Sequence, residues 1–204
     1  MEIKTLVLGP LQTNCYLAWC QKTLETVIID PADEGDFITE EILRLKLKPK
    51  YIILTHGHFD HCLGVLELKL NFNIPILLHK KDFSLYKNTQ KNAHYWLKRQ
   101  VDPTPPPDRS IKQNDQIKFG KESLKVLDTP GHTLGSVCLY SPPTLFSGDT
   151  LFKNGIGRTD FKYSDPKQMI TSLKTLTGFP PKTIVYSGHG EETTLQKELP
   201  FLPK

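Results

Sequence analysis

Residues 54–64 read LTHGHFDHCLG and place three histidines and an aspartate within six positions. The whole chain has seven histidines, so nearly half of them lie in this one short segment. A purely structural role for so many polar groups would need many hydrogen-bond partners. Imidazole and carboxylate groups together suit zinc, iron or manganese. The segment therefore predicts a metal site.

Three later segments repeat the arrangement, each with one chemically active residue just after a predicted strand. KVLDTPGHT carries His132, TLFSGDT carries Asp149 and TIVYSGHG carries His189. A glycine precedes each of them and allows the backbone to turn tightly. Because ligands gather at the strand ends of open α/β sheets, we expect the segments to converge.

Together the segments supply seven candidate metal ligands, namely His56, His58, Asp60, His61, His132, Asp149 and His189. Seven donors exceed the needs of one tetrahedral ion and suit two ions a few ångström apart. Asp149 is the natural bridging ligand, because the two oxygens of a carboxylate can bind separate ions. The absence of cysteine from the set argues against a closed structural zinc site. We expect two divalent ions, zinc first, with iron or manganese as alternatives. His79 and His94 lack this setting and are predicted to be surface or packing residues.

Alternating strands and helices must position these residues. Short apolar or alternating runs predict strands, at 3–8, 15–19, 26–30, 51–55, 74–79, 116–120, 123–129, 136–140, 144–149 and 183–188. Helices are predicted over 33–46, 60–71 and 164–178. The second should place Leu63, Leu66 and Leu70 on one side. The third should begin with Ser164 as its cap and place four apolar residues on one face, Met169, Ile170, Leu173 and Leu176.

The composition indicates a soluble globular protein, with 38% hydrophobic and 24% charged residues among 204. That length suits a single domain over 1–204. No apolar run approaches the ~20 residues of a membrane span, and no secretory leader is evident, so a cytoplasmic protein is expected. The net charge of +4 is spread along the chain, which argues against nucleic acid binding. The four cysteines form no CxxC pair and are predicted to be reduced, packed thiols.

THGHFDH, TPGHT, SGDTLF and SGHGEETT, in this order, resemble the metallo-β-lactamase-fold hydrolases. More narrowly, the chain resembles the short glyoxalase II-like (hydroxyacylglutathione hydrolase-like) proteins, from LQTNCYLAWC and VIIDPADE to the closing PFL. The resemblance implies an α/β (α+β) fold, an αββα sandwich of two mixed β-sheets flanked by helices, with the site at one edge. It also implies two ligand groups bridged by Asp149, the first being His56, His58 and His132 and the second Asp60, His61 and His189.

The reaction that this resemblance implies is hydrolysis of a small-molecule thioester such as S-lactoylglutathione. A hydroxide bridging two metals is a nucleophile at neutral pH and would attack the thioester carbonyl. The thiolate leaves readily, because a thiol has a pKa of ~8.5. Asp60 would be catalytic, as a ligand that also holds the hydroxide. Asp30 would lie beside the site, or would simply end its strand in a turn.

Arg158 matches a basic residue that contacts a glutathione carboxylate in glyoxalase II, a contact that suits a guanidinium group. The alternative is an ordinary ion pair with Asp160. The sequence departs from glyoxalase II at Asp160, where a tyrosine is expected, and we expect no C-terminal helical substrate domain. Glutathione recognition is therefore less well supported than the metal chemistry.

GRTDF also resembles a stretch of persulfide dioxygenases from the same superfamily. Such an enzyme would hold a single iron with His56, His132 and Asp149. We favour hydrolysis, because SGDTLFKNGIG and SGHGEETT match the glyoxalase II-like group better. Hydrolysis of another ester or a lactone rests on fold alone. The oligomeric state is not predicted.

Overall fold

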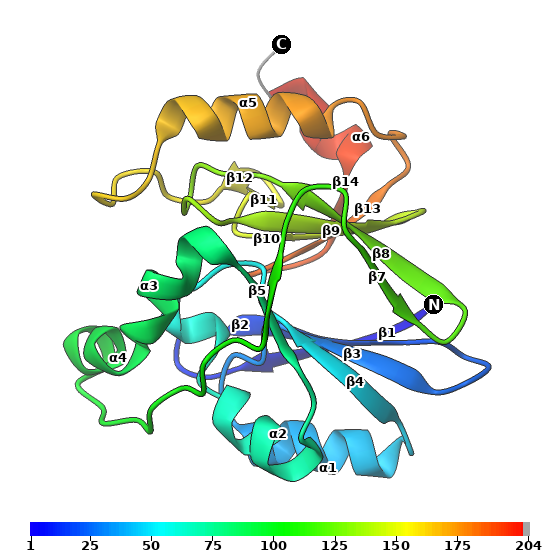
Figure 1. Cartoon of the computed structure of the whole chain (residues 1–204). Coiled ribbons are helices and arrows are strands. Elements are labelled where there is room, and N and C mark those ends of the chain that lie inside the picture. Colours follow the sequence, from blue (N-terminus) through cyan, green and yellow to red (C-terminus); the bar gives the residue numbers. More distant parts are fainter. Residues whose placement is uncertain (202–204) are drawn as a thin grey trace.

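In the computed structural model, which describes residues 1–201, two six-stranded sheets lie face to face between layers of helices (Figure 1). The first sheet has the order β1-β2-β3-β4-β5-β6. Its strands are β1 (Glu2–Leu8), β2 (Thr13–Trp19), β3 (Glu25–Ile29), β4 (Lys48–Ile53), β5 (Ile76–His79) and β6 (Arg109–Ile111). The first three strands are antiparallel, and β3 to β6 run parallel. The sheet is therefore mixed.

The second sheet has the order β14-β13-β10-β9-β8-β7 and is also mixed, because β10 and β13 run parallel while its other pairs are antiparallel. Its strands are β7 (Gln116–Phe119), β8 (Glu122–Asp128), β9 (Val137–Ser141), β10 (Thr144–Gly148), β13 (Ile184–Ser187) and β14 (Thr193–Thr194). A small hairpin of β11 (Leu151–Phe152) and β12 (Gly155–Ile156) forms a separate two-stranded sheet, and its Leu151 packs against the second sheet.

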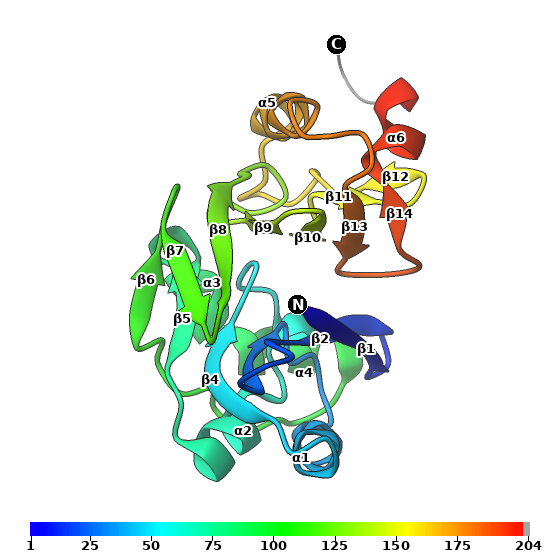
Figure 2. The same ribbon diagram turned by 90° about the vertical axis from the view of Figure 1, so that its right-hand side faces the viewer.

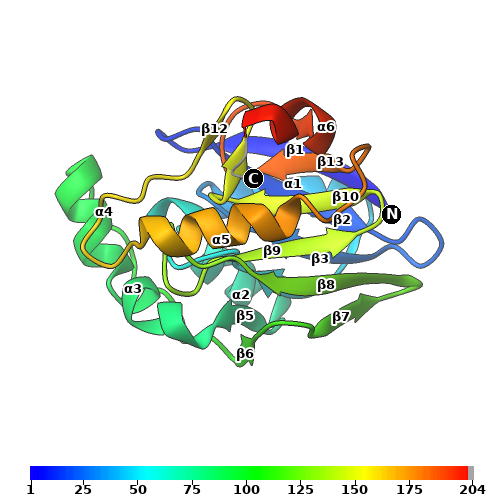
Figure 3. The same cartoon turned by 90° about the horizontal axis from the view of Figure 1, so that it is seen from above.

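The helices cover the two outer faces of the sandwich (Figure 2). α1 (Gly35–Arg44) and α2 (Val65–Phe72) pack on the first sheet, whereas α5 (Pro166–Leu176) and α6 (Leu195–Glu198) pack on the second. Seen from above, α5 lies over the second sheet (Figure 3). The remaining helical segments are α3 (Phe83–Lys87), α4 (Thr89–Leu97) and the short η1 (Phe59–His61), η2 (Lys80–Asp82) and η3 (Leu199–Phe201).

Alternation along the strands builds this layering. In β3, Ile28 packs into the core beneath α1 and α2, whereas Val27 and Ile29 pack into the core between the sheets. Successive strand residues point to opposite faces, so a sheet covered on both sides needs continuous apolar runs. A third core joins α5 to the second sheet through Leu173, Leu176 and Val185. These layers form the αββα sandwich expected from the resemblance. Among residues 1–201, no helix has the length and apolarity needed to cross a bilayer.

The predicted face of helix 60–71 is wrong. Residues 59–61 form the η1 turn instead, and α2 begins only at Val65 and buries Val65 and Leu68. Leu70, on the predicted apolar side of the helix, is 73% exposed. The shift follows from the histidine cluster, whose backbone bends into a tight turn and delays the start of the helix.

The late helix also differs in detail. Its cap is Asp165 rather than Ser164, since Asp165 Oδ1 accepts hydrogen bonds from the backbone N–H groups of Lys167 at 2.9 Å and Gln168 at 3.1 Å. Ile170 is 45% exposed, so the buried face is narrower than predicted. The sequence pattern predicts no helix over residues 83–97, where α3 and α4 lie. The extent of the domain, 1–204, stays a prediction.

Candidate metal centre

The segments that carry the seven candidate ligands all follow strands at one edge of the sandwich. Residues 56–61 follow β4 of the first sheet. His132 lies in the loop after β8, Asp149 directly follows β10 and His189 lies just past β13, all in the second sheet. The two sheets thus bring donors from both halves of the chain to one place, as the strand-end pattern predicts.

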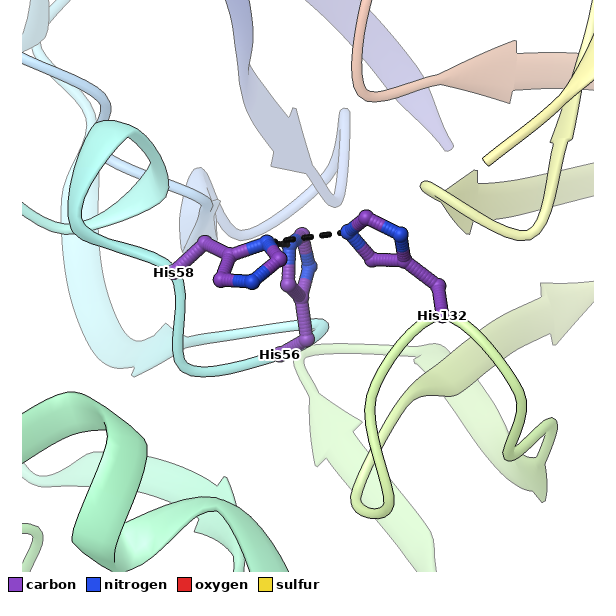
Figure 4. A group of neighbouring side chains, drawn as sticks. All are labelled: His56, His58 and His132. Atoms are coloured by element: carbon purple, nitrogen blue, oxygen red, sulfur yellow. Dashed lines mark hydrogen bonds between the residues drawn. The ribbon is translucent and has the colours of Figure 1, made fainter. Parts of the chain in front are cut away.

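Three histidine side chains point toward one another from two loops (Figure 4). His58 Nδ1 lies 3.0 Å from His56 Nε2 and 2.9 Å from His132 Nε2. All three rings are buried. Three ring nitrogens so close, each able to offer a lone pair, form a pocket for one cation.

A second group combines Asp60, His61 and His189, whose ligand atoms also lie within 4.8 Å of one another. Asp60 Oδ2 is 3.4 Å from His189 Nε2 and 3.7 Å from His61 Nε2. Asp149 lies between the two groups. Its Oδ1 is 3.4 Å from His61 Nε2, and its Oδ2 is 3.4 Å from His132 Nε2. One carboxylate can therefore face two ions.

Two buried atoms in this centre show that the residues fit a metal. Among the described residues, His61 Nε2 and Asp149 Oδ1 have no hydrogen-bond partner, although both are shielded from water. Leaving a buried polar group unpaired costs about 1–3 kcal/mol, and a charged group costs more. A cation between these atoms would satisfy both, so the donor set suits a divalent metal.

The electrostatics of the two groups differ. Burial lowers the pKa of His56 well below its ordinary value and that of His58 to about 3, so both rings are neutral and keep a lone pair for a metal. Burial also opposes a charge on His61, but Asp149 and Asp60 outweigh it and raise the pKa of His61 well above normal. Burial raises the pKa of Asp149, yet His61 and the other imidazoles hold it well below its usual range. The second ligand group, which contains Asp60 and faces Asp149, therefore attracts positive charge.

The ligand rings also form hydrogen bonds through the ring nitrogen that faces away from the metal site, as metal-binding histidines commonly do. His61 Nδ1 lies 3.0 Å from Asp30 Oδ2, and His132 Nδ1 lies 2.8 Å from the carbonyl oxygen of Arg158. Asp30 in turn accepts hydrogen bonds from Thr55, at 2.7 Å from the backbone N–H and 2.6 Å from the hydroxyl. Of its two predicted roles, the structure thus places Asp30 beside the site.

Asp82 is a buried residue that the sequence analysis did not single out. Its carboxylate accepts hydrogen bonds from the backbone N–H of Gly57 at 2.8 Å, from the backbone N–H of Gly135 at 2.7 Å and from Thr133 Oγ1 at 2.7 Å. Gly57 lies between His56 and His58, whereas Thr133 and Gly135 follow His132. Asp82 therefore ties together the two loops that carry the first ligand group. No local pattern marks it in the sequence.

Position 188 needs a glycine, because Asp149 and His61 lie too close to its backbone to leave room for a side chain. A Cβ atom at this position would lie 2.1 Å from Asp149 Oδ1 and 2.7 Å from His61 Cε1. Any side chain would therefore displace one of the two groups that face each other. This explains why glycine precedes His189 in the SGHG motif.

Of the two hypotheses for Arg158, the structure shows the ion pair with Asp160. Its guanidinium forms a two-pronged ion pair with Asp160, Nε to Oδ1 at 2.9 Å and Nη2 to Oδ2 at 2.8 Å, on the exposed surface. It also lies over the ring of Phe161, 4.5 Å from the centroid. Phe161 stacks on Tyr163 at 5.4 Å and approaches the His58 ring at the same centroid distance. No sequence pattern predicts this aromatic wall, which consists of Phe161 and Tyr163, and substrate contact by Arg158 stays a prediction.

The sequence matches the Metallo-beta-lactamase superfamily over residues 8–189. It is 35% identical over 208 residues to the probable metallo-hydrolase YqgX of Bacillus subtilis (strain 168), covering 99% of this chain and 98% of the relative. It is 34% identical over 210 residues to the hydroxyacylglutathione hydrolase GloC of Haemophilus influenzae, again covering 99% of this chain and 98% of the relative.

Solved structures agree over the whole fold. BLEG-1, a B3 metallo-β-lactamase, superposes with a TM-score of 0.92 at 34% identity and full coverage of both chains. TTHA1623 in a di-iron-bound form has a TM-score of 0.90 at 38% identity, covering 98% of each chain. ETHE1 from Myxococcus xanthus has a TM-score of 0.80 at 26% identity, covering 97% of this chain and 81% of the other. These matches confirm the predicted fold and family. The chain therefore belongs to the metallo-β-lactamase superfamily and is one of its metallo-hydrolases.

Proposed function

We propose that this protein hydrolyses a small-molecule thioester such as S-lactoylglutathione at a centre of two divalent ions. The observation that carries the proposal is the position of Asp149 between the two ligand groups. Its Oδ1 lies 3.4 Å from His61 Nε2, and its Oδ2 lies 3.4 Å from His132 Nε2 and 3.7 Å from His189 Nε2. His56, His58 and His132 would hold one ion, and Asp60, His61 and His189 the other. Zinc suits this donor set, and the di-iron form of TTHA1623 makes iron a realistic alternative.

When bound, the two ions would supply Lewis acidity and activate water at neutral pH. The protein's own part is to keep the attacking oxygen oriented. Burial raises the pKa of Asp60, but His61 and the hydrogen bond with His189 outweigh it and lower that pKa overall, so the carboxylate is ionised. Asp60 Oδ2 also accepts a hydrogen bond from Thr13 Oγ1 at 3.3 Å, which holds it in place. An ionised, oriented Asp60 can accept a hydrogen bond from the attacking water.

The substrate assignment rests on the likeness to GloC over nearly the full length of both chains. A glutathione carboxylate would bind the Arg158 guanidinium by replacing or sharing the Asp160 carboxylate, and both residues are exposed enough to permit this exchange. Phe161 offers an apolar surface next to that contact. Because glutathione is a major cytosolic thiol, the proposal also favours a cytoplasmic location.

A second candidate, oxidation of a persulfide at one iron, draws support from the ETHE1 neighbour and from the GRTDF segment. That chemistry would need only His56, His132 and Asp149 as protein ligands. It would leave His58, Asp60, His61 and His189 without a metal, although these residues complete two close donor groups. The full donor set therefore favours the two-metal hydrolase.

The test is turnover of S-lactoylglutathione by the purified protein, with bound metal measured in the same sample. We expect hydrolysis with about two metals per chain. Arg158→Ala should raise KM for this substrate and leave the metal content unchanged, and Lys162→Ala, a change of a nearby basic residue in the same segment, is the matched control. Absence of turnover together with about one iron per chain and oxygen uptake with glutathione persulfide would refute the thioesterase proposal. Hydrolysis of a lactone or β-lactam alone would redirect the substrate assignment.

A further inference from the structure

Residues 157–165 form hydrogen bonds with two of the three histidines of the first ligand group, His58 and His132. The carbonyl oxygen of Arg158 lies 2.8 Å from His132 Nδ1, and Ser164 Oγ donates a hydrogen bond to the His132 carbonyl oxygen at 2.6 Å. Between these contacts, Tyr163 Oη lies 2.7 Å from His58 Nε2. One stretch of chain therefore reaches ligands on both sides of the sandwich.

The direction of the contact between Tyr163 and His58 follows from the geometry of the ring. His58 Nδ1 faces the neighbouring imidazoles, 3.0 Å from His56 Nε2 and 2.9 Å from His132 Nε2, and is the atom placed to bind a cation. A nitrogen that binds a metal carries no proton, so in this ring Nε2 carries it. Nε2–H then donates to Tyr163 Oη, which acts as the acceptor.

We propose that Tyr163 is a positioning residue that holds the His58 ring with Nδ1 facing the metal pocket and the proton on Nε2. The proposal rests on the metal site of the proposed function, but it does not depend on the substrate. Asp30, Thr55 and the Arg158 carbonyl hold other ligand rings from behind, and Tyr163 supplies the corresponding contact for His58.

Aromatic packing surrounds the contact between Tyr163 and His58. Its ring stacks on Phe161 with an interplanar angle of 16°, and both rings meet the His58 ring edge to face, at 5.4 Å for Phe161 and 5.7 Å for Tyr163. Arg158 lies over the Phe161 ring of the same aromatic wall. The wall that we assign to the substrate side is thus packed directly against a metal ligand.

The decisive variant is Tyr163→Phe, which keeps the stacked ring and removes only the acceptor oxygen. Tyr140→Phe is the matched control, because Tyr140 packs against Phe179 in the core under α5, on the other face of the second sheet. Zinc affinity is measured by competition with a chelator. The tautomer of His58 is measured by long-range ¹H–¹⁵N spectra of the zinc-loaded protein, and cobalt absorption reports the coordination geometry. None of these measurements involves turnover.

We expect Tyr163→Phe to lose about tenfold in affinity for the ion that His56, His58 and His132 would hold. A loss of this size is usual when the hydrogen-bond partner of a metal ligand is removed. The Nε2–H resonance of His58 should shift or broaden, and the cobalt spectrum should change, while Tyr140→Phe matches the wild type. Wild-type metal affinity and histidine spectra in Tyr163→Phe would overturn the proposal. A wild-type protein that binds two metals but hydrolyses no thioester would refute only the proposed function. Failure of the wild type to bind metal would overturn both.

Discussion

Asp82 provides the sharpest test of how the two ligand loops are held together. The substitution Asp82→Asn keeps the volume of the side chain but replaces one acceptor oxygen with an NH₂ group. The amide is expected to turn so that its oxygen keeps the two donors at Oδ2, Gly57 N–H and Thr133 Oγ1. The NH₂ group then faces the Gly135 N–H, which Oδ1 accepts in the wild type at 2.7 Å.

The expected loss of stability follows from these contacts. One buried donor without an acceptor costs about 2 kcal/mol, and the two remaining hydrogen bonds lose about 1 kcal/mol each when the acceptor becomes neutral. Burial raises the pKa of Asp82 above its ordinary value even though the three hydrogen bonds oppose the shift, so ionising the carboxyl in this place is itself unfavourable. Because this pKa is raised, the desolvation cost that disappears with the charge is at least as large as the roughly 2 kcal/mol lost by the two remaining hydrogen bonds, so these two contributions approximately cancel. The net destabilisation is therefore about 2 kcal/mol, from the Gly135 N–H that is left without an acceptor.

The assay is thermal and urea unfolding of the chelator-treated protein, so that metal binding does not add to the measured stability. For a chain of this size a loss of about 2 kcal/mol lowers Tm by roughly 4–8 °C. Asp102→Asn, at an exposed position in the proline-rich segment, is the matched control and should unfold like the wild type. If Asp82→Asn unfolds within about 1 °C of the control, the carboxylate does not hold the loops and the reasoning fails.

Three further changes test other parts of the structure. Asp149→Ala should lose both metals and nearly all activity, and an unchanged metal content by elemental analysis would contradict its bridging position. Gly188→Ala should greatly weaken metal binding, because its Cβ would lie 2.1 Å from Asp149 Oδ1; a chelator competition curve like that of wild type would show that the backbone yields. Hydrogen bonds from Arg44 and Lys4 lower the pKa of Glu41 from 4.5 to about 2. Its ionised form therefore stabilises the fold above pH ~4.5, and that contribution is lost as the pH falls toward about 2. In urea unfolding of metal-free protein, the stability difference between wild type and Glu41→Gln should be constant near neutral pH and shrink across this window; a difference independent of pH would refute the assignment.

The sequence alone was sufficient to identify the candidate donors and most strands. A strand followed by a glycine and a histidine or aspartate is a local pattern, and four such patterns accumulate in one chain. The type of donor also limits the expected metals, because imidazole and carboxylate suit zinc, iron or manganese. The family resemblance predicted the αββα sandwich, and the comparisons confirm this fold. The resemblance also predicted the division of the ligands into two groups, which stays part of the proposal.

The supporting contacts were decided by the tertiary structure. Tyr163 meets His58 across 105 positions of sequence, and Asp82 reaches Thr133 across 51. Neither residue stands in a motif, because the need for a partner arises only when the sheets bring distant loops together. The same holds for the apolar face of α2, where the turn at the histidine cluster shifted the start of the helix. Local patterns report how each segment is built, whereas the partner of a buried polar group depends on which segments the fold places beside it.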